Sequence, residues 1–560
     1  TKSGKAIVAN DTHLPITMPS IWSMMNIESP TYKAAGVTIA GLPYIQLGYN
    51  GKIAWGATMV EADCQDLFIE TLRMQNGQTQ FLRANNTWSP VRERKEHFKV
   101  RFGRDRDVVL RFTANGPLVS DALNQLDETP HMSLVPVGSK TSFHIAMRWS
   151  LQDGDNAGAG IYEMGRAQTM EGFRRALSRI HSMYLNIVYS DGENIAWQTT
   201  GRIPVRSKGT GQLPSVAADG YRWKAFLPFE RQPHKENPKS GYLVTANERT
   251  VPKGDTRHIS GVWYSPERAE RITDVLSKRS DWDGEETKKL QLDLYSRMAE
   301  KTLFILNAME RNLKEAIQRL PTKKQKRAKS ALEILSKFDN VMAKDSKGAA
   351  LISAFYYTFT RNVFGDELGI DSSLWKNFID TNLRSYNAPQ DHVLGRDESP
   401  FFDDIRTEAK ESKADMLALS LADAYEFCED AMGSPDKWRW GKLHKIYWRS
   451  DITKDLPLSN WYFNYGPVAY QGDSHTVNVA HYAWGENFET FVIPAMRLVV
   501  DFGKIEPVEL IVHSGVSGHP SSKHYNDQIK YFLEGKNHPL PIRDAAKSAQ
   551  YTKILTLEKK

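Results

Sequence analysis

The sequence has few residues that could cross-link it and no stretch that could hold it in a membrane. Cys64 and Cys428 are its only cysteines, which excludes a disulfide framework and a four-cysteine metal site but leaves the redox compartment open. No apolar run approaches the ~20 residues that span a bilayer. The first residues, TKSGKAIVAND, have neither the charged start nor the apolar middle of a signal peptide. We therefore expect a chain without a membrane span, whose start at Thr1 is a processed or truncated end.

Charge of one sign is not concentrated in this chain. The 73 basic and 67 acidic residues leave a net charge of +6, which is too dilute for a nucleic-acid footprint without a basic stripe. One basic run, PTKKQKRAKS at 321–330, lies between helical patterns, and we interpret it as a solvated helix end or turn. We expect no nucleic-acid partner.

The composition is that of a packed globular protein. Hydrophobic residues make up 40% of the chain, charged residues 25% and aromatic residues 11%, with no compositional sign of disorder. A chain of 560 residues exceeds what one hydrophobic core usually supports. We therefore expect either several domains or one core with a large insertion.

Short strand-like runs fill the first half of the chain. Apolar and polar residues alternate between turn signals such as NG, NGP and DG, which favours hairpins over helices. The runs are KAIVAND, IQLGYNGKIAWGAT, HFKVRFGRDRDVVLRFTANGPLV, NIVYSDGENIAWQTTGRIPV and GYLVTAN.

The period changes to that of a helix after DWDGEE at 281–286. One apolar stripe at helical spacing comprises Leu306, Met309, Leu313, Ile317 and Leu320. The same period returns in KADMLALSLADAYEF at 413–427, and strand character reappears from about 447 in HTVNVAHYAW and PAMRLVVDFG. We predict a sheet-rich core at 1–280 and 447–560, interrupted by a helical insertion at 281–446.

Two short segments carry residue types that chemistry could use. His13 lies in ANDTHLP, where a histidine is more often an ordinary loop residue than a functional one. Asp63 and Asp66 lie in NGKIAWGATMVEADCQDLF at 50–68 and supply hard oxygen ligands three residues apart, as calcium prefers. Such pairs are usually solvated or cap a turn, so each segment alone is weak.

Together with five later blocks, these segments resemble the penicillin acylase family of penicillin, cephalosporin and acyl-homoserine-lactone acylases. The blocks occur in family order and, with the first two, span residues 9 to 528. They are SGYLVTANERT (240–250), SPERAERI (265–272), GDSHTVNVA (472–480), PAMRLVVDF (494–502) and SGHPSSKHYNDQ (517–528).

The resemblance implies an α+β fold, the four-layer αββα sandwich of N-terminal-nucleophile hydrolases, with a large helical insertion. It implies a precursor that cleaves itself into this large chain and a smaller α subunit, in the periplasm or outside the cell. The serine freed by that cut attacks a linear amide of a small N-acyl substrate. The α-amino group of the serine, with a pKa near 8, acts as the base.

The nucleophile itself is not in the sequence. In the family, the large chain begins with about ten residues that start with Ser-Asn, and the serine is the nucleophile. The segment that TKSGKAIVAND resembles comes after these residues. Thr1 is chemically capable of acting as an N-terminal nucleophile but stands too close to His13 for the family geometry. An amide hydrolase with its serine upstream is therefore expected. A catalytically inactive relative that serves binding or structure is the alternative.

The resemblance also implies roles for individual residues. The backbone N–H of Met59 and the side-chain amide of Asn247 would form the oxyanion hole. Arg268 would orient Asn247, and His13 would lie near the nucleophile. The structural alternatives are that Asn247 forms a turn and that Arg268 is a surface ion-pair partner.

The same matching predicts a metal site and an acyl pocket. The carboxylates of Asp63 and Asp66 and the carbonyl of Gln65 would bind a structural calcium, with a further ligand from the partner chain. Asp255 lies where another carboxylate could join, although its spacing to Arg268 departs from the family pattern. The substrate-binding positions are Leu14, Leu47 and Ala57. Aliphatic walls at Leu14 and Leu47 suit an acyl chain better than a phenyl ring.

Overall fold

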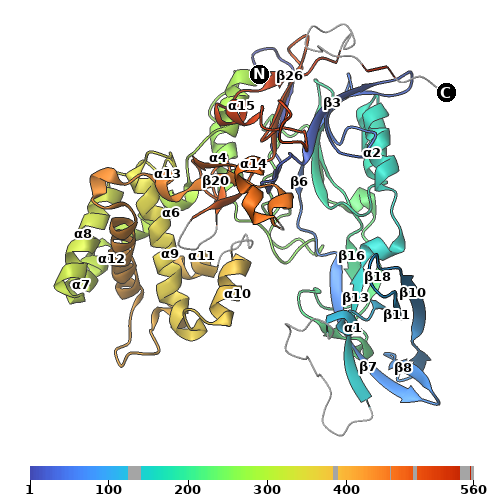
Figure 1. Cartoon of the computed structure of the whole chain (residues 1–560), viewed down its shortest axis with the longest axis horizontal. Coiled ribbons are helices and arrows are strands. Elements are labelled where there is room, and N and C mark those ends of the chain that lie inside the picture. Colours follow the sequence, from blue (N-terminus) through green and yellow to red (C-terminus); the bar gives the residue numbers. More distant parts are fainter. Residues whose placement is uncertain (124–140, 383–388, 455, 483–487, 543–554, 557–560) are drawn as a thin grey trace.

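Two stacked antiparallel sheets form the centre of the computed structural model, which describes residues 1–123, 141–382, 389–454, 456–482, 488–542 and 555–556 (Figure 1). The larger sheet has the order β19-β15-β14-β6-β5-β4-β3. Its strands are β3 (Trp22–Glu28), β4 (Lys33–Ile39), β5 (Leu47–Tyr49), β6 (Ala54–Met59), β14 (Leu185–Ser190), β15 (Ile195–Thr199) and β19 (His234–Glu236). The smaller sheet, β1-β24-β25-β26, contains β1 (Ile7–Asn10), β24 (Met496–Asp501), β25 (Val508–Val512) and β26 (His538–Pro539).

The two sheets share one apolar core and carry helices on their outer faces. Every residue of β24 is buried, and its Leu498 and Val500 pack in the same cluster as Trp55 of β6. The helices α2 (Ala157–Arg166) and α3 (Met170–Leu177) cover the larger sheet, where Phe173 stacks on Tyr189 at 4.8 Å between ring centroids. The helices α5 (Gly284–Gln291) and α15 (Ile529–Leu533) cover the smaller sheet. This is the α+β, four-layer αββα arrangement expected from the resemblance.

A separate group of helices lies to the left in Figure 1 and has its own core. It contains α6 (Arg297–Ala308), α7 (Glu310–Arg319), α8 (Thr322–Leu335), α9 (Lys347–Leu368), α10 (Ser373–Asn382), α11 (Pro389–Leu394), α12 (Lys413–Met432) and α13 (Trp440–Leu443). The predicted stripe faces this core, since Leu306, Leu313 and Ile317 are buried there. Within the described ranges, no helix combines the length and the apolar character needed to cross a bilayer.

The basic run 321–330 belongs to this helical group. It forms the start of α8, where Arg327 is buried and pairs with Glu426 and Glu429 of α12. Lys324 pairs with Asp423 on the same helix. Two of the basic residues of this run are therefore paired with acidic residues of α12.

A second sheet region forms the lower lobe of Figure 1. Its main sheet is β13-β7-β8-β9, with β17 pairing in parallel with β7. The lobe contains β7 (Gln65–Gln75), β8 (Gln78–Leu82), β9 (Trp88–Pro90), β10 (Arg92–Phe98), β11 (Arg106–Thr113), β12 (Gly116–Pro117), β13 (Thr141–Trp149) and β17 (Ser215–Val216). Two further strands, β16 (Pro204–Arg206) and β18 (Trp223–Phe226), pair with each other between this lobe and the central sheets (Figure 1).

A further sheet joins the helical group to the centre. It contains β2 (His13–Pro15), β20 (Lys445–Trp448), β21 (Tyr465–Ala469), β22 (His481–Tyr482) and β23 (Thr490–Pro494).

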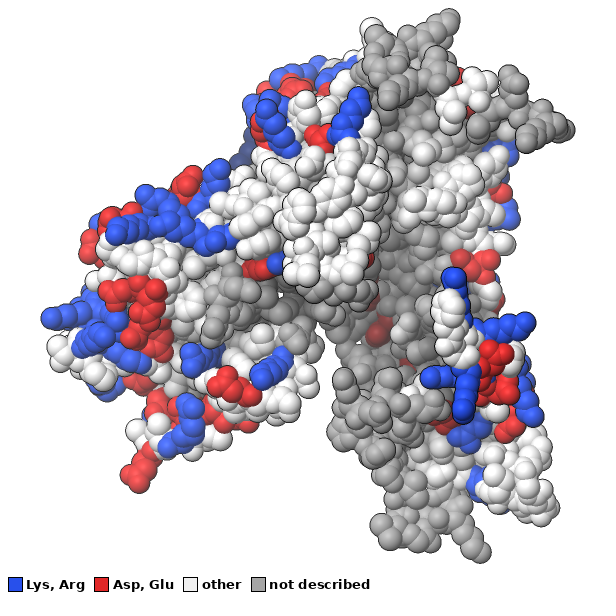
Figure 2. Space-filling view, in the orientation of Figure 1, with Lys and Arg blue, Asp and Glu red and all other residues white. Residues whose placement is uncertain are grey.

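Beside this sheet, apolar side chains are exposed to solvent. Helix α14 (Asn460–Phe463) carries Trp461, which is 84% exposed, and Leu458 just before the helix is 94% exposed. We call Ile452, Leu456, Leu458, Trp461, Tyr462 and Tyr465 the 452–465 surface. Figure 2 shows mostly uncharged residues over α14, near the centre of the view.

Several features differ from the sequence-based expectations. In HTVNVAHYAW at 475–484, only His481 and Tyr482 of the described residues form a strand. The run GYLVTAN at 241–247 forms no strand, and its last residue, Asn247, has a φ of +72°, which a strand does not allow. Helix α5, which the sequence patterns place in the insertion, packs on β24 of the sandwich. The boundaries at 280/281 and 446/447 stay a prediction.

Asp391 of α11 is a buried carboxyl that should make stability depend on pH. Its Oδ1 is buried and has no hydrogen-bond partner among the described residues. Burial raises the pKa of Asp391 to about 7, although His475 acts against the shift. An unfolded aspartate titrates near pH 4. As the pH rises from 4 to 7, the unfolded state therefore loses this proton before the folded state does, and the free energy of unfolding falls.

Asp391→Asn removes this titration and is expected to raise the Tm by a few degrees at pH 8 and by less at pH 5. Differential scanning calorimetry at the two pH values measures the difference. Asp397→Asn, at an exposed carboxyl of the same segment, is the control. An equal Tm change at both pH values would contradict the assignment.

Candidate active site

The last residue of β6 presents a backbone N–H beyond the point where β6 pairs with β5. Val60 N donates to Tyr184 O (3.1 Å), and hydrogen-bonded positions alternate along an antiparallel pair. The N–H of Met59 therefore points away from β14. It lies on the same edge as the N–H of Ala57, which donates to Asn10 Oδ1 (3.1 Å).

Asn247 meets Met59 from a loop of the same region. Its Nδ2 donates to Met59 O (2.9 Å), which uses one of the two amide hydrogens. The φ of +72° lies in the left-handed region, which asparagine adopts more readily than most residues. Thr58 Oγ1 donates to Thr245 Oγ1 (3.0 Å) just beside this contact, so two hydrogen bonds join the loop to β6.

Arg268 holds the Asn247 amide from the other side. It lies in the first turn of α4 (Glu267–Leu276) and is buried. Its Nη2 donates to Asn247 Oδ1 (2.9 Å), and its Nη1 is 3.4 Å from His13 Nδ1. Because Oδ1 accepts from the guanidinium, Nδ2 is fixed on the side of Met59. Arg268 is therefore not a surface ion-pair partner.

His13 is an uncharged imidazole in this site. Burial is the main cause of a lowered pKa, which Asp11 opposes and Arg268 reinforces. A neutral imidazole that accepts from Arg268 at Nδ1 carries its proton on Nε2. Asp11 Oδ2 lies 3.6 Å from that Nε2. The ring thus lies between the Asp11 carboxylate and the Arg268 guanidinium.

His481 of β22 is a further member of this cluster that the sequence patterns do not identify. It is buried, and burial followed by the charges of Arg268, His13 and His475 lowers its pKa well below the usual value. His481 directly follows the family block at 472–480. This position next to the block is the only feature of the sequence that could have marked it as a site residue.

The arrangement can stabilise negative charge on an oxygen. A carbonyl oxygen placed between the Met59 N–H and the Asn247 amide would meet two N–H donors, with a guanidinium behind them. All four predicted residues, His13, Met59, Asn247 and Arg268, are brought together. Their catalytic roles stay predictions.

Thr1 lies elsewhere. Its Oγ1 donates to Lys5 O, and Lys2 N donates to Trp282 O (2.9 Å) just before α5. Strand β1 separates this end from the segment that carries His13. The geometry therefore offers no support for Thr1 as the nucleophile.

The three predicted pocket residues all belong to or pack against the core of the sandwich. Leu47 on β5 and Ala57 on β6 are buried in the central core, and Leu14 on β2 packs against it. Their contact with substrate stays a prediction, as does the aliphatic character of the pocket.

The predicted calcium residues lie together at the start of β7 but do not fit a metal ion as arranged. The Asp66 carboxylate is buried against Arg206, with Oδ1 2.6 Å from Nη2. Asp63 Oδ2 is 2.6 Å from His258 Nε2. Gln65, whose carbonyl is the third predicted ligand, is the first residue of β7 and lies opposite Trp149 of β13. In the part of the chain that the structure describes, no three His, Cys, Asp or Glu residues are grouped to hold a metal. Sequence patterns could not pair Arg206 with Asp66, because the two are 140 residues apart.

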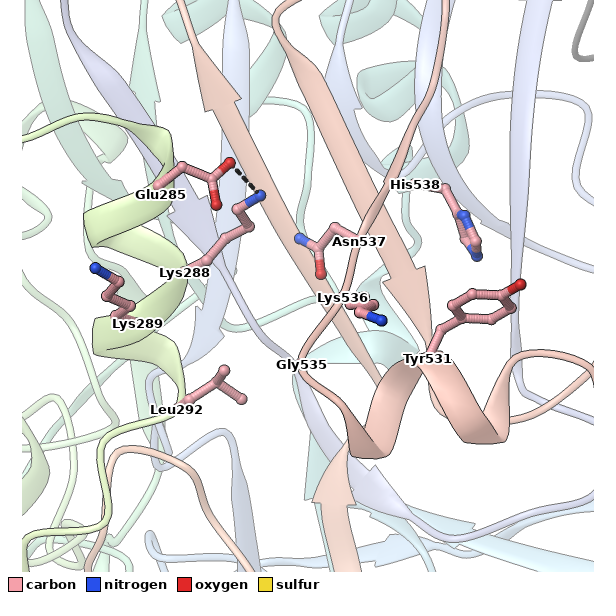
Figure 3. Close-up of a pocket in the computed structure, with 9 residues that line it drawn as sticks. All are labelled: Glu285, Lys288, Lys289, Leu292, Tyr531, Gly535, Lys536, Asn537 and His538. Atoms are coloured by element: carbon pink, nitrogen blue, oxygen red, sulfur yellow. Dashed lines mark ion pairs between the residues drawn. The ribbon is translucent and has the colours of Figure 1, made fainter.

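An open pocket of about 310 Å³ lies outside this site, between α5 and the α15–β26 segment (Figure 3). Lys288, Tyr531 and His538 are among its lining residues. Lys288 is paired with Glu285 at 2.6 Å, so the pocket offers no unpaired charge at that position. None of the predicted site residues lines it.

Comparison with known proteins shows the family to which the chain belongs. A family model described as penicillin amidase matches residues 1–549. The chain is 42% identical over 559 residues to the acyl-homoserine lactone acylase QuiP of Pseudomonas aeruginosa, covering 97% of this chain and 65% of that protein. It is 24% identical over 538 residues to the penicillin acylase 2 proenzyme of a Pseudomonas species, covering 94% of this chain and 64% of that protein. The chain thus spans slightly less than two thirds of the length of these relatives.

The fold has a counterpart among solved structures. A thermostable penicillin G acylase from Alcaligenes faecalis matches with a TM-score of 0.67, covering 100% of this chain and 99% of that chain. The sequence identity is 16%, so this likeness concerns the fold.

Proposed function

Because the chain belongs to the penicillin amidase family, we propose that it is the large chain of an amide hydrolase that cleaves the linear amide of an N-acyl substrate. The observation that carries the proposal is the contact of Asn247 with both Met59 and Arg268, at 2.9 Å each. A scaffold without catalysis would have no need to hold an amide group in this way beside a backbone N–H.

The proposed reaction is acyl transfer through an N-terminal serine that lies upstream of Thr1 in the full-length protein. The α-amino group of that serine takes the proton from the hydroxyl as the oxygen attacks the amide carbon. The negative charge on the carbonyl oxygen is received by the Met59 N–H and the Asn247 amide. The amine leaves with a proton, and water then releases the acid from the acyl-enzyme.

N-acyl homoserine lactones are the preferred substrate class. The relative at 42% identity is named an acyl-homoserine lactone acylase, whereas the penicillin acylase 2 proenzyme is at 24%. The aliphatic side chains of Leu14 and Leu47, if they line the acyl pocket, fit a fatty acyl chain.

A smaller chain cut from the same precursor is the proposed partner. The 452–465 surface supports it, because clustered exposed apolar residues mark interaction sites. Trp461 and Leu458 are among the most exposed large side chains of the protein, and the relatives are longer than this chain. A periplasmic or secreted location is part of the proposal and rests on the family; cell fractionation tests it.

The full-length protein is expected to release free homoserine lactone from N-acyl homoserine lactones. Mass spectrometry separates this amide cleavage from lactone opening, and phenylacetyl amides serve as the comparison substrates. The active fraction should contain two chains, the larger with an N-terminal serine by Edman degradation. Correctly cleaved protein that releases no amine from either class would favour the inactive relative. An active single chain would contradict the proposed partner.

A further inference from the structure

A buried arginine takes the position that the calcium prediction assigns to a metal ion. Arg206 of β16 reaches the connection between β6 and β7. Its Nη2 donates to Asp66 Oδ1 (2.6 Å) and to Asp63 O (3.0 Å), and its Nε donates to Asp66 Oδ2 (2.8 Å). The side chains of Arg206 and Asp66 are 5% and 6% exposed. We call Asp63, Asp66, Arg206 and Trp223 the Arg206 clasp.

The oxygen atoms of the clasp are already occupied by donors. Trp223 Nε1 donates to Asp66 Oδ2 (2.7 Å), so each Asp66 oxygen accepts from the clasp itself. Calcium needs six to eight oxygen ligands at about 2.3–2.6 Å. A guanidinium bound to the same oxygens excludes the ion both by its volume and by its positive charge.

The other candidate ligand is paired as well. Asp255 faces Arg257, whose Nε is 2.9 Å from Asp255 Oδ1, and this contact lowers the pKa of Asp255 to about 2. Its carboxylate is thus held by a second arginine. A divalent cation would have to displace a guanidinium at each of these carboxylates.

The backbone around the clasp leaves just enough space for the guanidinium. Gly211 has a φ of +84°, and a Cβ at this position would lie 2.3 Å from Asp66 Oδ1 and 2.7 Å from Arg206 Nε. A glycine is required here both by the left-handed backbone and by the close approach. The chain is therefore shaped around an Arg206–Asp66 pair.

The clasp is connected to both proposed oxyanion donors. Asp63 lies four residues after Met59. Its N–H donates to Ile259 O (2.8 Å), and its Oδ2 contacts His258 Nε2. The segment with His258 and Ile259 begins at the Asn247 loop, where Tyr264 N donates to Asn247 O (3.2 Å). Arg206 thus holds Asp63, the residue that joins the segment after Met59 to the segment after Asn247.

We propose that the Arg206 guanidinium replaces a divalent cation at the start of β7 and makes Arg206 a positioning residue for the oxyanion hole. The role in positioning rests on the proposed function. The replacement of the metal rests on the clasp alone, so the two parts can be tested separately.

The first experiment uses the wild-type full-length protein. Elemental analysis of the native protein, dialysed against metal-free buffer without a chelator, should find no stoichiometric calcium, and the Tm should be the same in EDTA as in millimolar calcium. One calcium per molecule, or a Tm several degrees lower in EDTA, would overturn the replacement whether or not the protein hydrolyses an amide.

The second experiment compares Arg206→Met with Arg206→Lys and with Arg111→Met. Arg111 forms a comparable bidentate pair with Asp121 in the lower lobe, far along the chain from Asp63. Arg206→Met should lower kcat roughly 10-fold or more with little change in KM. The reason is that the Met59 N–H and the Asn247 amide would be displaced by a fraction of an ångström to about 1 Å. Arg206→Lys should recover part of kcat, and Arg111→Met should change the Tm alone. Unchanged kcat in folded, processed Arg206→Met would overturn the positioning role.

Discussion

Asn247→Ala is expected to lower kcat roughly 100- to 1,000-fold while KM changes little. The side-chain amide donates to the oxygen that gains charge, so its interaction is stronger in the transition state than with bound substrate. The geometry supports this expectation, because Arg268 fixes Oδ1 and leaves Nδ2 directed to Met59. Steady-state kinetics on the full-length, processed protein with an N-acyl homoserine lactone measure the effect.

Two further variants separate this effect from backbone strain. An alanine at a φ of +72° adds about 1–2 kcal/mol of strain, whereas Asn247→Gly deletes the amide without it. Both variants should lose kcat to a similar extent. Asn237→Ala is the control, because Asn237 also has a positive φ but hydrogen-bonds to Asn194 away from the site.

Precursor cleavage must be verified first, since an uncut precursor would imitate a catalytic defect. A folded, processed Asn247→Ala protein with near-normal kcat would remove Asn247 from the oxyanion hole. It would also weaken the transfer of the other family roles to this chain.

Arg268→Met is the second substitution with a large expected effect, a loss of roughly 10- to 100-fold in kcat. Methionine keeps much of the length of the side chain but cannot donate to Asn247 Oδ1, so the amide can rotate away from the oxyanion position. Arg268→Lys should restore part of the loss, because a lysine supplies a charge and donors without the planar fork. The measured quantity is kcat per folded molecule.

A double variant distinguishes positioning from a direct role. If Arg268 acts through Asn247, then Arg268→Met should lower kcat little further in an Asn247→Ala background. Arg271→Met, on the same helix and paired with Asp293, should leave kcat unchanged. Fully multiplicative losses in the double variant would assign Arg268 a separate role.

The family and the fold were predictable from the sequence, because matching blocks occur in order along nearly the whole chain. The blocks that contain His13, Met59, Asn247 and Arg268 do meet in space, as the resemblance implied. Helical periodicity also identified the buried positions Leu306, Leu313 and Ile317.

Other features depend on partners that no local pattern reveals. The stripe from Leu306 to Leu320 is continuous in the sequence, yet α6 ends at Ala308 and α7 starts at Glu310, with neither glycine nor proline to signal the break. The acidic loop has the same residues whether its partner is calcium or a guanidinium, and Arg206 lies far away in the sequence. The alternating pattern of GYLVTAN favours a strand, but the left-handed Asn247 and its contacts with Met59 and Arg268 hold it as a loop.

The uncharged state of the buried histidines determines the electric potential that an oxyanion would meet. Burial keeps the pKa of His13 and of His481 low, so neither ring contributes an imidazolium near neutral pH. The guanidinium of Arg268 keeps its charge at every pH at which the protein is folded. Near neutral pH, the positive potential behind the Asn247 amide therefore comes from Arg268 and not from a protonated imidazole.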